Sequence, residues 1–136
     1  MTKTEKPILV EQILGTWRLD RATAHDPEGK PLKPPYGPIP MGRLIFNADG
    51  RMMAVVCDGR VEIPAQGPRA YASYCGNFTL RGDMLTTKVD AAARAERIGG
   101  EQIRRLEFRG GHLVLIPPCR ASGEQRELFW SLDGPA

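Results

Sequence analysis

Arginine and tyrosine side chains that share a strand face with apolar residues are the first candidates for chemistry in this sequence. Side chains alternate between the two faces of a β-strand, so apolar residues at every second position identify the buried face. Leu106 and Phe108 identify that face in one segment, and Arg104 lies on it. Arg126 shares the face of Trp130 in a second segment. We therefore expect both arginines to point inward.

The same alternation places a tyrosine inside. Tyr74 shares the face of Phe78 in the segment 74–80. Tyr36 and Tyr71 are expected in loops, from which either could present its hydroxyl to the same interior. Buried tyrosines usually form hydrogen bonds with the surrounding protein, so a structural role and a ligand-binding role are both open for each phenol.

Arg104 also has two possible roles. An isolated buried charge is very costly, so an inward guanidinium must be paired or hydrogen-bonded. It could stack on the indole of Trp17 and close one end of the fold. Alternatively, it could bind a carboxylate or an enolate-like oxygen of a ligand.

Two carboxylates are candidates for acid–base catalysis. Asp90 and Glu101 flank the predicted connection between two strands and could reach the rim of an interior cavity. Either one could act as a general base, while Tyr74 or Tyr36 donates a proton and Arg104 stabilises developing negative charge. The alternative is that both carboxylates are simply solvated.

Aromatic and sulfur-containing side chains complete the candidate ligand-binding set. They suit the wall of a mostly apolar site, although the same residue types fill protein cores. This ligand-binding set is Tyr36, Trp17, Cys57, Tyr71, Phe78, Phe108, Arg126 and Trp130.

Neither a metal nor a nucleotide cofactor is indicated. The three cysteines show no CxxC spacing, and we expect them to be buried, reduced thiols. His25 and His112 are far apart and have no evident third ligand. No glycine-rich phosphate-binding motif is present. We therefore expect no cofactor.

The elements that must position these side chains are mostly short strands. From residue 42 onward, apolar alternation is interrupted by turns rich in Asn, Asp and Gly. A first strand begins near Thr16, after a short predicted helix at 8–14 that ends at Gly15. About eight sequential strands predict an all-β, antiparallel up-and-down barrel, because closure removes exposed strand edges.

Two other segments break the strand pattern. Residues 24–41 carry six prolines, which a sheet ladder does not accommodate, so they are expected to form a long loop over one mouth of the barrel. Asp90 and the alanine-rich residues 91–97, followed by Gly99, predict a short helix or tight loop at the crossover.

Length and charge restrict the class of protein. A chain of 136 residues with 41% hydrophobic residues fits one domain, expected at 8–133 with flexible termini. Its net charge of +3 is too small to indicate nucleic-acid binding. No apolar stretch is long enough to span a membrane. The N-terminal residues are charged and have no apolar h-region, so we expect no signal peptide. We expect a cytoplasmic monomer or homodimer that contacts neither nucleic acid nor membrane.

An ordered set of short motifs resembles the bacterial and fungal lipocalin-like domain family. A GxW signature near the first strand opens the set, and the resemblance extends from about Leu14 to Trp130. The matching segments are 15–19, 35–38, 42–46, 49–52, 74–78, 99–106 and 128–130. The resemblance implies a small β-barrel whose cavity holds one small, mostly apolar molecule.

The sequence departs from that family's pattern in two places. Relatives tend to carry histidines where this chain has Thr86, Thr87 and Lys88. They also tend to end in Trp-Glu-Arg, whereas this chain has Trp130, Ser131 and Leu132. Histidine chemistry and the usual barrel-closing arginine are therefore not carried over.

Together these observations predict a lipocalin-like barrel that binds a small hydrophobic or aromatic molecule with a polar group. Arg104 and Tyr74 are its expected polar anchors. The alternative is a cofactor-independent isomerase, cyclase or lyase of small-molecule metabolism that acts on such a molecule in the same cavity. A barrel with a filled core that binds other proteins is a third possibility.

Overall fold

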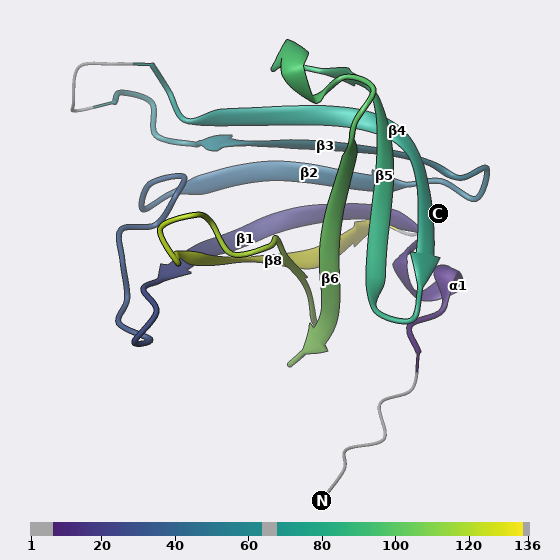
Figure 1. Cartoon of the computed structure of the whole chain (residues 1–136), viewed down its shortest axis with the longest axis horizontal. Helices are drawn as coiled ribbons and strands as arrows, with labels where there is room; N and C mark the ends of the chain where they lie inside the picture. Colours follow the sequence, from purple (N-terminus) through teal and green to yellow (C-terminus); the bar gives the residue numbers. More distant parts are fainter. Residues whose placement is uncertain (1–6, 64–67, 135–136) are drawn as a thin grey trace, which may run out of the picture.

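The computed structural model describes residues 7–63 and 68–134 and shows a closed antiparallel barrel of eight strands (Figure 1). Each strand pairs with the next one in the sequence, and the last pairs with the first. The strands are β1 (Gly15–His25), β2 (Pro40–Phe46), β3 (Arg51–Asp58), β4 (Tyr71–Arg81), β5 (Met84–Ala92), β6 (Glu101–Arg109), β7 (His112–Ile116) and β8 (Gln125–Gly134). The predicted up-and-down barrel is confirmed.

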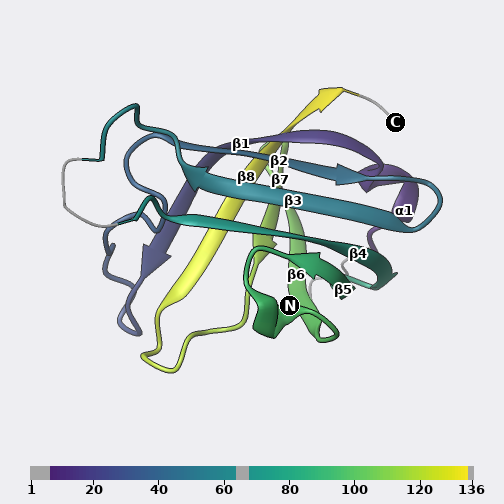
Figure 2. The ribbon, with the colours of Figure 1, turned by 90° about the horizontal axis from the view of Figure 1, so that it is seen from above.

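Closure depends on the pairing of β1 with β8. The register runs from Thr16 opposite Gly134 to His25 opposite Gln125, with irregularities after Thr16 and Leu19. Seen from above, β8 crosses obliquely beneath β1 and β2 (Figure 2). The sheet therefore leaves no long unpaired edge, which would otherwise promote aggregation.

A short helix, α1 (Val10–Ile13), precedes the barrel and lies at one of its ends (Figure 1). The prediction of a helix here is confirmed, although it is shorter than the expected 8–14. Ile13 is fully buried, and its carbonyl accepts a 2.9 Å hydrogen bond from the indole N–H of Trp17. Trp17 is thereby fixed in the core that fills this end of the barrel.

The short helix or tight loop predicted at the crossover is present, but it is shorter than the expected 91–97. Ala91 and Ala92 continue β5 by pairing with Cys75 and Tyr74, and only Ala95–Arg97 form a short 3₁₀ turn, η1. Strand pairing with β4 therefore overrides the helix propensity of the alanines, as tertiary context often does. The consequence is that Arg97 is carried to the rim of the barrel interior.

Strand β4 bends where it passes β5. The register shifts between Cys75 and Gly76, and a Cβ atom at Gly76 would lie 1.9 Å from the carbonyl oxygen of Lys88. Only glycine permits this close approach, since real Cβ contacts are much longer.

Large buried side chains fill the barrel interior beside α1. They belong to one cluster that includes Ile13, Trp17, Leu44, Phe46, Leu85 and Leu106. In the described part of the chain, no helix has the length and apolar character needed to cross a membrane.

Candidate functional site

A cavity of about 240 Å³ lies inside the barrel, away from the side chains that fill the end near α1. A cavity of about 150 Å³ holds one benzene molecule, so this space suits a somewhat larger small molecule. Its apolar wall comes from Ala54, Val56, Ala72, Leu115, Leu128 and Trp130, and Pro117 and Pro118 lie at its edge. Small side chains on β3 and β4 leave this space open.

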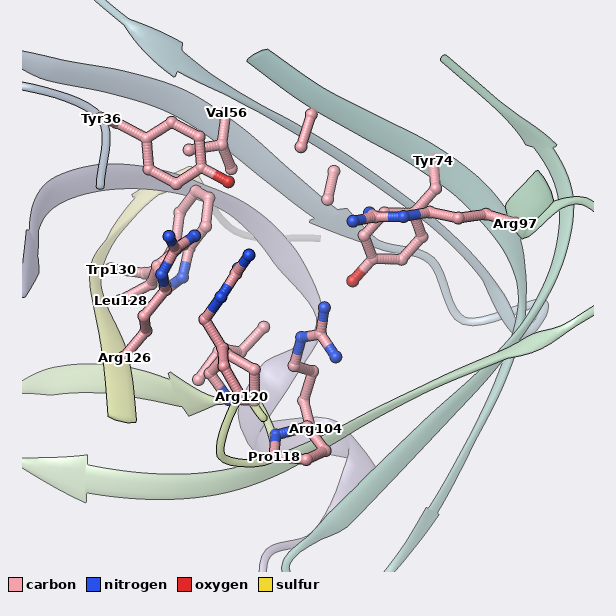
Figure 3. A pocket seen from close by; sticks show the side chains of 14 residues that line it. Tyr36, Val56, Tyr74, Arg97, Arg104, Pro118, Arg120, Arg126, Leu128 and Trp130 are labelled. Carbon is pink, nitrogen blue, oxygen red and sulfur yellow. The ribbon is translucent and has the colours of Figure 1, made fainter. Parts of the chain in front are cut away.

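Six polar side chains point into the same cavity (Figure 3). The wall contains no carboxylate from the described residues. An interior rich in cations and hydroxyl donors favours a negatively charged occupant. The polar set is Tyr36, Tyr74, Arg97, Arg104, Arg120 and Arg126.

Arg104 comes from β6, and neighbouring uncharged groups hold its guanidinium. Its Nη2 donates to Oε1 of Gln102 at 2.9 Å, and its Nη1 donates to the carbonyl of Ile103 at 2.8 Å. Among the described residues it forms no ion pair. Burial lowers the pKa of Arg104, although an arginine remains charged at neutral pH. The site therefore contains an uncompensated positive charge.

Tyr74 lies on β4 beside this charge and is buried. Burial raises the pKa of its phenol, and nearby Arg104 and Arg97 oppose that increase. The hydroxyl is therefore protonated at neutral pH. No hydrogen bond to another described side chain contributes to its titration, so the O–H is available to donate to a ligand.

Arg120 and Arg126 form a second cationic group, which is partly neutralised. The Nε atom of Arg126 lies 3.0 Å from Oε2 of Glu124, and the Nε atom of Arg120 lies 3.7 Å from Oε1. Glu124 thereby holds both guanidiniums near the cavity. One carboxylate cannot neutralise two arginines, so this group keeps a net positive charge.

Trp130 forms part of the apolar wall and is 1% exposed. Its indole N–H has no hydrogen-bond partner among the described residues, a condition it shares with the hydroxyls of Thr23 and Thr87. A buried donor without a partner is costly.

The structure brings five of the predicted site residues together at the cavity: Tyr36, Tyr74, Arg104, Arg126 and Trp130. The alternative in which Arg104 stacks on Trp17 is not what the structure shows. Trp17 instead contacts Phe108, at 6.5 Å between ring centroids. In the described part of the chain, the cation–π contacts are those of Arg21 and Arg109 with Phe129.

The two proposed bases lie outside the cavity wall. Asp90 forms an ion pair with Arg51 and also accepts from the Cys75 thiol at 3.5 Å. The hydrogen bond from Arg51 lowers the pKa of Asp90, which makes it a weaker base. Glu101 is exposed at the start of β6 and does not line the cavity.

The remaining predicted ligand contacts also lie elsewhere. Phe78 packs edge-on against Phe46 in the filled core, with ring centroids 5.1 Å apart. Phe108 is 42% exposed. Tyr71, which was expected in a loop, begins β4 with its side chain out of phase with the inward residues, and its hydroxyl donates to Ser73 at 2.8 Å. Cys57 is out of phase in the same way on β3. It is buried, whereas Cys75 is half-buried and Cys119 is exposed, so the expectation of buried thiols is correct only for Cys57.

Sequence reasoning missed Arg97 and Arg120 as site residues. Both come from connections between strands, where alternation does not identify an inward face. A partial signal existed for Arg97, because the crossover containing it was expected across one barrel end. The described residues contain no cluster of three or more His, Cys, Asp or Glu that could hold a metal ion.

Among the comparisons with known proteins, a family model agrees with the fold. The model of a family described as lipocalin-like domain matches residues 14–131. Among curated proteins, none matches this sequence. One solved structure, an uncharacterised protein from Bacteroides eggerthii, shares 15% identity with a TM-score of 0.43, covering 85% of this chain and 97% of that one.

Proposed function

The chain belongs to the lipocalin-like domain family, and from that premise and the cationic cavity we propose that it binds a small organic anion with an apolar or aromatic body. The observation that carries the proposal is Arg104, a charged guanidinium that faces the cavity without a carboxylate partner among the described residues.

The acid group of the ligand would occupy the space between Arg104 and Tyr74. A carboxylate there accepts hydrogen bonds from a guanidinium and from a phenol that is protonated at neutral pH. Hydrogen bonds to charged groups contribute about 1.5–3 kcal/mol each, so these two donors would dominate the polar part of the affinity.

The body of the ligand would contact the alanines, leucines and Trp130 that form the apolar wall. The cavity volume of about 240 Å³ limits this body to roughly one or two rings or a short alkyl chain. Burial of such a body would supply the remaining affinity, at about 25 cal/mol per Å² of apolar surface.

Calorimetric titration with 4-methylbenzoate and its uncharged amide, 4-methylbenzamide, tests this proposal. The anion should bind more tightly than the amide, and Arg104→Gln should remove that preference. Arg105→Gln is the matched control, since Arg105 is the next residue on β6 and is exposed. Equal affinity for the anion and the amide in the wild-type protein would contradict the proposal.

A cofactor-independent isomerase, cyclase or lyase acting in this cavity remains the second candidate. The observation that favours it is a protonated phenol beside a fixed cation, which together can donate a proton and stabilise an oxyanion. With a turned-over substrate, Tyr74→Phe should lower kcat much more than it changes KM. Binding alone predicts a change in affinity and no product.

A further inference from the structure

We infer that the ligand of this cavity carries two acidic groups at opposite ends of its apolar body, an inference that rests on the proposed function. Its basis is the distribution of the four arginines into two groups that approach the cavity from different elements (Figure 3).

The first group consists of Arg97 and Arg104 together with Tyr74. Arg97 comes from η1 and Arg104 from β6, and both charges act on the phenol of Tyr74. Neither arginine forms an ion pair with a described carboxylate. This group therefore presents two uncompensated positive charges to one end of a ligand.

The second group consists of Arg120 and Arg126, which share Glu124. Arg126 is the second residue of β8, and Arg120 lies in the connection before that strand. In Figure 3, Arg126 lies across the cavity from Arg97 and Tyr74, with the guanidinium of Arg120 between them. This group keeps one net positive charge for a second acid.

A monoacid would satisfy only one of the two groups. It would leave the net positive charge of the other group without an anionic partner, whereas a second carboxylate there would gain further charge-assisted hydrogen bonds. The cavity wall also contains apolar side chains, among them Leu115 and Leu128, which suit a hydrocarbon body joining the two acids. A diacid with such a spacer matches both the charges and the wall.

Matched ligand pairs test this inference by calorimetry. The pairs are 4-methylbenzoate with terephthalate, and octanoate with octanedioate, because each pair differs by one carboxylate. We expect the diacid of at least one pair to bind tenfold or more tightly than its monoacid. Phenyl phosphate serves as a dianion whose two charges lie on one group.

Arg126→Gln identifies the second anchor. It should reduce the affinity of the better diacid to about that of its monoacid, while changing monoacid affinity less than threefold. Arg94→Gln is the matched control, because Arg94 is exposed and pairs with Glu96 outside the cavity wall. The melting temperature of each variant verifies that it is folded.

The results of these titrations distinguish a diacid ligand from a monoacid ligand. A diacid advantage that disappears in Arg126→Gln and persists in Arg94→Gln supports the inference. Monoacids that bind as tightly as their diacids, or phenyl phosphate that binds more tightly than both diacids, overturn it and leave the proposed function intact. If no anion of the panel binds, the inference and the proposed function both fail.

Discussion

At the scale of single residues, the phenol of Tyr74 connects burial to charge. Burial raises its pKa above the ordinary value of 10.0, and Arg104 and Arg97 reduce that increase. The unfolded chain therefore releases the phenolic proton at a lower pH than the folded protein does. By linkage, the contribution of Tyr74 to stability is present below pH about 10 and decreases as the pH rises through the folded-state pKa.

The corresponding prediction compares the wild-type protein with Tyr74→Phe. The difference in free energy of unfolding between them should stay constant up to about pH 10. Above that pH the wild-type protein should lose stability relative to the variant, by at most about 1.4 kcal/mol per pH unit. Urea unfolding at several pH values measures it. A difference that does not vary up to pH 11 would show that the phenol is not buried as described.

A second residue-scale prediction concerns Thr87, which is 1% exposed and whose hydroxyl has no partner among the described residues. Replacing Thr87 with Val removes the unsatisfied hydroxyl and keeps the shape. We expect the free energy of unfolding to rise by about 1 kcal/mol. Thr86→Val, on the half-buried neighbouring position, should change it by less than about 0.5 kcal/mol. Destabilisation by Thr87→Val would indicate a partner for the hydroxyl.

At the scale of elements, the proline-rich segment between β1 and β2 positions Tyr36 at the cavity. Asp58 lies against this segment: it is 4% exposed, and its Oδ2 lies 2.6 Å from Nη2 of Arg60. Gly37 packs against this ion pair with φ of +75°, and a Cβ atom there would lie 2.5 Å from Oδ2 of Asp58. A side chain at position 37 would therefore displace the segment.

Gly37→Ala should accordingly destabilise the protein and weaken ligand binding, because Tyr36 moves with its neighbour. Gly29→Ala is the matched control, since Gly29 also has a positive φ (+85°) but has open space around it. The control should cost about 1 kcal/mol in unfolding free energy and leave affinity unchanged. Urea unfolding and calorimetry of both variants provide the comparison. Equal affinity in both variants would show that the segment does not position the site.

The same elements show what could be predicted from the sequence. Period-two alternation predicted the inward positions of Tyr74, Arg104 and Arg126, because strand geometry fixes which side chains share a face. The extent of the short helix or tight loop expected at 91–97 was overestimated, because Ala91 and Ala92 pair with β4, a contact distant in sequence. Arg97 and Arg120 were missed because loop residues carry no periodic signal.

At the scale of the whole molecule, positive charge is concentrated around one cavity. The net charge of +3 is modest, yet four arginines line one cavity of about 240 Å³. Most surface arginines form ion pairs with carboxylates. Examples are Arg109 with Glu127 and Arg51 with Asp90. The positive potential is therefore directed at the ligand, which favours the binding of anions.

This distribution predicts a salt dependence that is specific to charged ligands. The affinity for 4-methylbenzoate should fall severalfold when NaCl increases from about 0.05 M to 0.5 M, because screening weakens attraction in a cavity open to solvent. The affinity for 4-methylbenzamide should stay nearly constant. Calorimetry at several salt concentrations measures both, and parallel behaviour of the two ligands would contradict an electrostatic role for the arginines.

Two tryptophans serve as internal probes for the binding of an organic anion in the barrel interior. Trp130 lines the cavity, whereas Trp17 lies outside it with its indole N–H bonded to Ile13. In ¹H–¹⁵N NMR spectra of the labelled protein, titration with 4-methylbenzoate or terephthalate should shift the Trp130 indole signal and leave the Trp17 signal nearly unchanged. If neither signal moves, or only that of Trp17 moves, the anion does not bind in the cavity, which contradicts the proposed function.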